Sequence, residues 1–370
     1  MAESVGDTGQ SRRDDVMRLF ERPIHVRSVI MTALLVLAVF YTLYFARFVL
    51  IPVALALIFN LLLGPIVTRM QRWHIPRSFS ALLIIGSFTA VVCYGGYMLM
   101  GPAQYWINRA PEAFSAFNEQ TQDLQKQIKD MNKSTEELKK AAADLIGKAS
   151  QQTTIQINEK GLRAQIMANV QWAAGILFMT LIMLYFMLCS RGSMFRKLLL
   201  MTRTGRSRRN AVRIVRHLQA DIGRYLATVT AINIVLGACA AGVLWAIGLT
   251  DPILWGVLVG LLNFAPYAGA AISLAAITLA SFATFDTLAH ILLAPAAVFA
   301  LNVLEGNFIT PAIHGRRFEM SPLMVFFALF FWGWLWGVAG MLMAVPLLVV
   351  CKVTCDHIAE LRPIGRALGR

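Results

Sequence analysis

The sequence predicts an all-α polytopic membrane protein with about six full transmembrane helices, two broken or re-entrant helical hairpins and an amphipathic helical segment outside the membrane. Hydrophobic residues make up 57% of the 370 residues and charged residues 15%, whereas soluble domains carry roughly 45–50% and about 25%. Several apolar runs of about 20 residues are long enough to cross a hydrocarbon core of about 30 Å. Two more, 252–283 and 322–350, are too long for one simple crossing and carry glycine or proline at their centres.

The first 100 residues are predicted to hold a cytoplasmic tail and three transmembrane helices. Residues 1–28 are polar, with five basic and five acidic residues, and lack the short apolar core of a cleavable signal. Apolar spans follow at 29–46 and 48–67, with Arg47 between them, and a third span runs over 79–100. The arginines of the loop between the second and third spans predict that this loop is cytoplasmic.

A polar segment, 101–169, separates the third span from the fourth. Apolar side chains recur in it at seven-residue intervals, at Phe117, Leu124, Met131, Leu138 and Leu145. That spacing is typical of a coiled-coil-type amphipathic helix. Ser134-Thr135-Glu136-Glu137 resembles a capping box and would divide the segment into two helices. The stripe could pack on its own subunit or form an intersubunit contact, and we expect the segment to be extracytoplasmic.

The charge pattern after the fourth span (170–190) sets the predicted orientation. Residues 191–224 contain ten Lys or Arg and one acidic residue, Asp221. So short and basic a segment is expected in the cytoplasm, and membrane orientation explains its charge without any nucleic acid. The remaining segments are predicted to be an apolar core at 225–352 and a cytoplasmic C-terminal tail at 353–370.

The two long apolar runs of this core are predicted to be broken helices. The run 263–269 reads Asn-Phe-Ala-Pro-Tyr-Ala-Gly, and proline cannot continue the helical hydrogen-bond ladder. The second run is interrupted by Gly333, Gly337 and Gly340. Paired broken segments indicate the site of a secondary transporter, because their freed backbone groups must be satisfied by protein or by a water-filled cavity. The alternative is that neighbouring helices fill simple kinks.

Polar residues beside these breaks are the candidate solute contacts. Asn263, Tyr267, Asn302 and Asn307 could face a cavity, although a buried Asn can also serve only to join two helices. Glu305 could titrate as a coupling group, or it could be a solvated helix end. Because charge is scarce in these runs, the sequence favours a neutral, hydroxyl-rich or amphipathic solute.

Several function classes are excluded by missing motifs. The chain has no Gly-x-x-x-x-Gly-Lys-Ser/Thr phosphate loop, no HExxH zinc motif and no evident Ser/His/Asp arrangement. Its six histidines are scattered, and its five cysteines include no Cys-x-x-Cys pair. We therefore expect no enzyme, no cofactor and no metal.

Three runs of the core resemble the autoinducer-2 exporter family. They are 254–269 with its Asn-Phe-Ala-Pro-Tyr-Ala-Gly ending, 302–311 (Asn-Val-Leu-Glu-Gly-Asn-Phe-Ile-Thr-Pro) and 331–347 (Phe-Trp-Gly-Trp-Leu-Trp-Gly-Val-Ala-Gly-Met-Leu-Met-Ala-Val-Pro-Leu). The resemblance implies a bacterial inner-membrane protein that forms a homo-oligomer, with a pentamer expected. It also implies transport of a small solute such as the quorum-sensing signal autoinducer-2. Some relatives resemble sodium(lithium)/proton antiporters.

Together, the breaks and the resemblance predict an inner-membrane secondary transporter that exports a small neutral hydroxylated solute, autoinducer-2 first. Its predicted partners are this solute, the bilayer and further copies of the chain, with no nucleic acid. Two alternatives stay open: a sodium(lithium)/proton antiporter that uses Glu305, and a non-transporting envelope scaffold. The predicted substrate-binding residues are Asn263, Pro266, Tyr267, Asn302, Asn307 and Pro311, and the predicted hinge or gating residues are Gly269, Gly333, Gly337 and Gly340.

Overall fold

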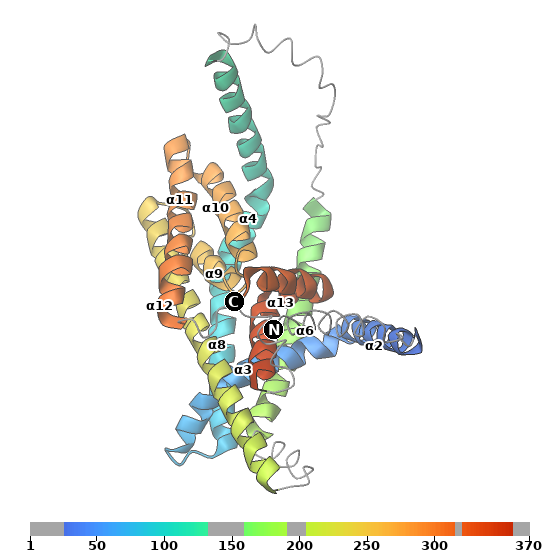
Figure 1. Ribbon diagram of the computed structural model, residues 1–370. Coiled ribbons are helices and arrows are strands. Elements are labelled where there is room, and N and C mark those ends of the chain that lie inside the picture. Colours follow the sequence, from blue (N-terminus) through green and yellow to red (C-terminus); the bar gives the residue numbers. More distant parts are fainter. Residues whose placement is uncertain (1–25, 132–158, 191–204, 315–319, 358–370) are drawn as a thin grey trace, which may run out of the picture. The chain divides into compact units, whose positions relative to one another are not determined.

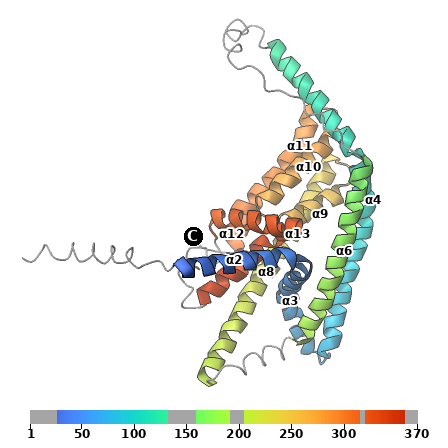
Figure 2. The same cartoon turned by 90° about the vertical axis from the view of Figure 1, so that its right-hand side faces the viewer.

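The fold is seen in a computed structural model that describes residues 26–131, 159–190, 205–314 and 320–357 (Figures 1 and 2). The elements of these ranges are helices joined by short connections, as the sequence predicts. The chain divides into two compact units, Met1–Leu50 and Ile51–Arg370.

The first unit contains α2 (Val26–Phe45) and the beginning of α3 (Arg47–Gln71). A single residue, Ala46, separates the two helices, and its carbonyl accepts hydrogen bonds from the N–H groups of Val49 and Leu50 at 2.9 Å. The interruption therefore falls beside Arg47, where the sequence predicts it.

In the second unit, α3 packs with α4 (Arg77–Met131) and α6 (Glu159–Ser190). Their shared core consists of Ala56, Val67, Ala81, Ile84, Leu184 and Leu188. Arg77 Nε donates a hydrogen bond of 2.8 Å to the carbonyl of Leu188, near the end of α6. A cation at this position satisfies a last-turn carbonyl and complements the helix dipole.

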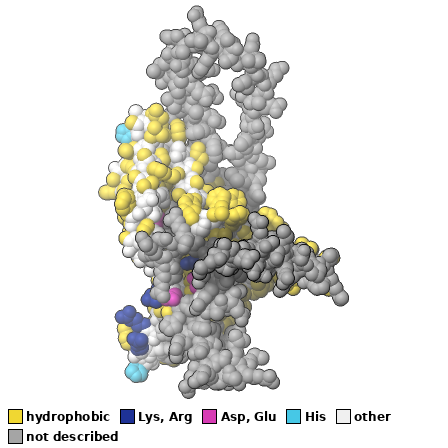
Figure 3. Space-filling view, viewed as in Figure 1, with side chains coloured by type: hydrophobic (Ala, Val, Ile, Leu, Met, Phe, Trp, Pro, Cys, Tyr) yellow, Lys and Arg dark blue, Asp and Glu magenta, His cyan; other side chains and the backbone are white. Residues whose placement is uncertain are grey.

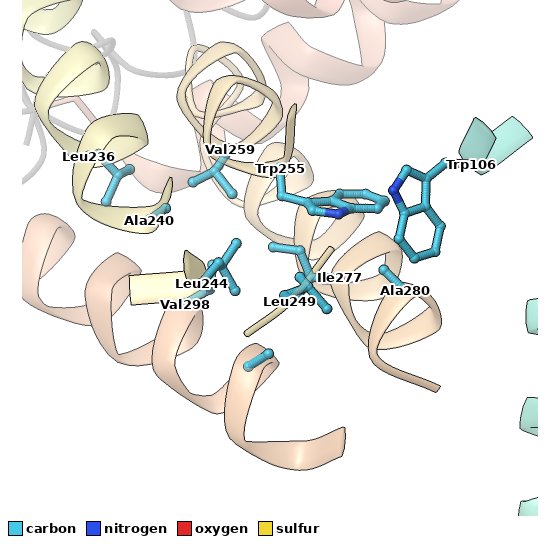
Figure 4. Packing of buried hydrophobic residues seen from close by; sticks show 11 residues of the cluster. Trp106, Leu236, Ala240, Leu244, Leu249, Trp255, Val259, Ile277, Ala280 and Val298 are labelled. Carbon is cyan, nitrogen blue, oxygen red and sulfur yellow. The ribbon is translucent and has the colours of Figure 1, made fainter. Parts of the chain in front are cut away.

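A second core is built by five helices, two of which flank the first predicted break. It joins α4, α8 (Gly205–Ile247), α9 (Pro252–Leu262), α10 (Ala268–Thr284) and α11 (Leu288–Leu304). Figure 4 shows Leu244, Val259, Ile277 and Val298 among the side chains that meet there. After α11 the chain forms a π-helical turn, η2 (Glu305–Ile309), and then α12 (Thr310–His314) and α13 (Pro322–His357).

Six helical stretches of the described residues are long and apolar enough to cross a membrane. They are Arg47–Gln71, Arg77–Arg109, Gln171–Ser190, Gln219–Ile247, Leu288–Ile313 and Pro322–Asp356. The predicted first span, 29–46, corresponds to α2, which is 20 residues long. Helix α13 is long enough to count as one span only because its two halves are taken together.

Two helices extend beyond the predicted apolar spans. Helix α4 continues past residue 100 without a break to Met131 and takes in the first part of the polar segment. Likewise, α8 begins inside the basic segment at Gly205. The predicted capping box at 134–137 and the stripe residues Leu138 and Leu145 lie outside the described residues.

Candidate functional site at the helix breaks

The first break is a tight turn of residues 263–267 between α9 and α10. Asn263 ends α9, and the N–H of Ala268 donates to the carbonyl of Pro266 at 2.7 Å. Tyr267 has φ 64° and ψ −58°, a conformation that is rare for a residue with a side chain, and its ring is 59% exposed. The predicted break is thus found, with α9 and α10 each too short to be a full span.

Gly269 is buried immediately after this turn, in the first turn of α10. A Cβ atom at this position would collide with the carbonyl oxygen of Leu262 in α9. Only a glycine lets the start of α10 come so close to the end of α9. A glycine is needed at this position because of its small size. Its backbone conformation would also be open to other residues, because its φ is not in the positive range.

Asn263 is joined to the long helix α8 by a side-chain hydrogen bond. Its Nδ2 donates to Oδ1 of Asn233 at 2.9 Å, and Asn233 is only 3% exposed. The two helices approach closely beside this pair, because a Cβ on Gly260 would lie 2.7 Å from the carbonyl oxygen of Asn233. The structure thus places a pair of amides, of which Asn233 is buried and Asn263 half-buried, at the first break.

The other predicted polar residues lie on α11, η2 and α12, where their hydrogen bonds stay local. Nδ2 of Asn302 donates to the carbonyl of Val298, and Nδ2 of Asn307 donates to the carbonyl of Val303, both at 2.9 Å. Asn307 and Pro311 are exposed in this single chain. The hydrogen bonds of Asn302 and Asn307 therefore do not connect these residues to Asn263.

Glu305 begins the π-helical turn and is half-buried. Its carboxylate accepts a hydrogen bond from Oγ1 of Thr310, the first residue of α12. π-Helical turns inside helices are frequent at functional sites. The sequence singles out Glu305 but carries no signal for the π-helical turn.

The second break lies within α13, at Gly337. Gly337 has φ 64° and ψ −143°, a region open to glycine alone. A Cβ on Gly340 would collide with the carbonyl oxygen of Trp332, and a Cβ on Gly333 would lie 2.7 Å from Cγ of Met341. Residues eight apart in a straight helix are separated by about 12 Å along its axis, so the chain must reverse here.

The three predicted hinge glycines of α13 therefore have different positions. Gly337 supplies the backbone conformation of the turn, while Gly333 and Gly340 permit close contact between the two halves of α13. The predicted second hairpin is present, and its turn is at Gly337.

The start of α9, at the opposite end of that helix from the first break, is joined to α4 by a contact that the sequence does not reveal. Nε1 of Trp106, on α4, donates to Oδ2 of Asp251 at 3.1 Å, and its ring meets Trp255 edge-on with a centroid distance of 5.2 Å. Asp251 precedes α9 but makes no side-chain hydrogen bond to that helix, because its carboxylate binds Trp106 instead. The two residues are 145 positions apart, and a single sequence gives no signal for such a pair.

The environment of the first break is almost free of charge. Asp251 is the single charged residue in the sequence between Tyr225 and Thr284. Hydrophobic side chains cover the surface of α10 and α11 in the space-filling view (Figure 3). An ion would therefore find no oppositely charged side chain of α9 or α10 to bind, whereas the amides can bind a neutral polar group.

Comparison with known proteins identifies the family. Residues 33–360 match the family described as AI-2E family transporter. The chain belongs to the AI-2E family of transporters. The predicted resemblance is thereby confirmed, and both helix breaks fall within the part of this AI-2E chain that matches.

Several curated proteins are similar to this AI-2E family member. It is 28% identical over 350 residues to the AI-2 transport protein TqsA of Escherichia coli K12, covering 90% of this chain and 93% of that protein. A putative transport protein of Borreliella burgdorferi is 35% identical over 158 residues, which are 40% of this chain and 41% of the relative. Putative transport protein YueF of Bacillus subtilis is 24% identical over 321 residues, 84% of each chain.

Proposed function

We propose that this protein is a secondary transporter of the bacterial inner membrane that exports a small neutral hydroxylated solute, with autoinducer-2 as the first candidate. The observation that carries the proposal is the uncharged break at 263–267, where the Asn263–Asn233 amide pair joins α8 to α9. Family membership supports transport in general, and the name of the relative TqsA supports autoinducer-2 as the solute.

The proposed mechanism follows from the chemistry of the two breaks. Amide and backbone groups at a helix break can replace the water molecules that a hydroxylated solute loses on entering the membrane. Asn263, Pro266 and Tyr267 would shape the first part of the path, and Asn302, Asn307 and Pro311 would extend it along α11, η2 and α12. Movement at Gly337 between the halves of α13 would open and close this path.

Orientation and assembly form part of the same proposal. The basic segment 191–224 favours a cytoplasmic location for itself and, by the number of crossings, for both termini. Assembly into a homo-oligomer, with a pentamer expected from the family resemblance, would cover exposed apolar side chains such as Phe308 and Ile313.

The experiment that tests the proposal is uptake of labelled autoinducer-2 into inside-out proteoliposomes, with and without an imposed pH gradient. We expect uptake that depends on the protein, and a rate that changes with the gradient if transport is coupled to protons. Uptake no faster than in protein-free liposomes under both conditions would reject autoinducer-2 as the solute.

A second candidate function is sodium(lithium)/proton antiport at Glu305. It is favoured by the half-buried position of this carboxylate at the start of η2 and by its hydrogen bond from Thr310. A sodium or lithium pulse should then release protons from vesicles that contain the wild-type protein. Glu305→Gln should remove this response, and a wild-type protein without any response would exclude antiport.

A further inference from the structure

The side chain of Asn233 has a hydrogen-bond donor that the protein does not use. Asn233 is 3% exposed, and its Oδ1 accepts the hydrogen bond from Nδ2 of Asn263. Its own Nδ2 is buried and has no hydrogen-bond partner in the structure. A buried donor without an acceptor costs about 1–3 kcal/mol, so a group of this kind requires an explanation.

The position of Asn233 restricts the possible explanations. The backbones of α8 and α9 are close together here, because a Cβ on Gly260 would lie 2.7 Å from the carbonyl oxygen of Asn233. The side chain of Asn233 is hydrogen-bonded to Asn263, the residue that ends α9. Asn233 therefore lies on the rigid helix α8 immediately beside the turn 263–267. A motion of this turn would change what its Nδ2 can reach, while Asn233 itself stayed fixed on α8.

We infer that Asn233 is a solute-contacting residue, whose Nδ2 donates a hydrogen bond to a hydroxyl or carbonyl oxygen of the transported molecule. The inference rests on the proposed transport function and extends it to a residue outside the predicted binding set. Asn263 has a second role in it, because its hydrogen bond to Oδ1 fixes the orientation of the Asn233 amide. The pair selects a neutral oxygen acceptor, since neither helix α9 nor α10 carries a charged side chain.

The first test asks whether one oxygen atom of the solute accepts a hydrogen bond from the Asn233 amide. Uptake of labelled autoinducer-2 and of analogues that each lack one hydroxyl group is measured with the wild-type protein and with Asn233→Leu, whose side chain has a similar branched shape but no hydrogen-bonding group. We expect one analogue to have a KM at least tenfold higher than autoinducer-2 in the wild type, and the two compounds to have equal KM values in Asn233→Leu. An unchanged ratio of KM values in the variant would overturn the inference.

The second test does not require the right solute, and it separates a failure of this inference from a failure of the proposed substrate. Asn233→Cys is treated in proteoliposomes with a small, uncharged, water-soluble methanethiosulfonate, and modification at position 233 is read by peptide mass spectrometry. The control is Ser281→Cys, because Ser281 is fully buried and its hydroxyl donates to Ile277 in its own helix at 2.8 Å. Peptide readout distinguishes these positions from the native cysteines.

We expect modification of Cys at position 233 and none at position 281. An unmodified position 233 in a folded, transporting protein would overturn the inference, because no path would then lead to the amide. If position 233 is modified but the analogues are not distinguished, the amide binds only water and the inference also fails. If the wild type does not take up autoinducer-2 and position 233 is modified, the substrate assignment fails while access to Asn233 stands.

Discussion

At the scale of single residues, the contact of Trp106 with Asp251 ties α4 to the beginning of α9. Asp251 has φ 56°, in the left-handed region that aspartate tolerates better than most residues. Because its carboxylate is half-buried, water can replace part of a lost hydrogen bond. We expect Trp106→Phe, which keeps an aromatic ring against Trp255, to lower the free energy of unfolding by about 1–2 kcal/mol. Thermal unfolding of the purified protein in detergent would measure this.

The matched control is Asp251→Asn, which keeps an acceptor oxygen and tolerates the same backbone conformation. Its unfolding midpoint should lie much closer to the wild type than that of Trp106→Phe. If the two variants unfolded at the wild-type midpoint, the hydrogen bond between α4 and α9 would have no energetic importance.

Gly269 provides a second test at this scale. A methyl group at this position would overlap the carbonyl oxygen of Leu262, which belongs to the backbone and cannot rotate away. We expect Gly269→Ala to destabilise the protein by about 1–3 kcal/mol, the typical cost of overpacking. Gly242→Ala is the control, because a Cβ there meets no atom within 4 Å. Equal unfolding midpoints of the two variants would contradict the described turn.

At the scale of elements, the hairpin of α13 depends on one backbone conformation at Gly337. Gly337→Ala would force a side chain into a region of φ and ψ that only glycine adopts, at a cost of about 1–3 kcal/mol. Gly333→Ala should cost less, since the atom in its way is Cγ of the flexible Met341 side chain. Unfolding and transport rates of the two variants should therefore differ, with Gly337→Ala the more impaired.

The helix breaks could be predicted from the sequence because proline and glycine act locally. Pro266 cannot donate a backbone hydrogen bond, and Gly337 alone permits the turn in α13, so both breaks lie inside the predicted runs. The ends of long helices are harder to predict, because the end of an apolar span need not be the end of its helix. Helix α4 continues past residue 100 into the polar segment, which is itself amphipathic.

Contacts between distant segments could not be predicted from one sequence. The importance of Asn233 depends on its hydrogen bond to Asn263, and that of Trp106 on a residue 145 positions away. The π-helical turn at Glu305–Ile309 likewise has no residue pattern that distinguishes it from the end of an ordinary helix. Conversely, Asn302 and Asn307 fit the sequence criteria for a polar site, yet each donates its side-chain hydrogen bond to the backbone carbonyl four residues earlier.

At the scale of the whole molecule, the basic charge predicts an orientation that can be measured. We expect Ser207→Cys, inside the segment 191–224, to react with a membrane-impermeant thiol reagent in inside-out vesicles and not in right-side-out vesicles. Peptide mass spectrometry identifies the labelled position. The opposite labelling pattern would contradict the proposed orientation.

The central claim is that a small neutral solute crosses the membrane beside the break at 263–267. The most direct test is the initial rate of labelled autoinducer-2 uptake by inside-out proteoliposomes that contain equal amounts of wild-type protein or Asn263→Ala. We expect the wild type to exceed protein-free liposomes clearly, and Asn263→Ala to be at least tenfold slower although it is folded and assembled. Equal rates for the two proteins would contradict the role of the break, and a wild-type rate equal to that of empty liposomes would contradict transport of this solute.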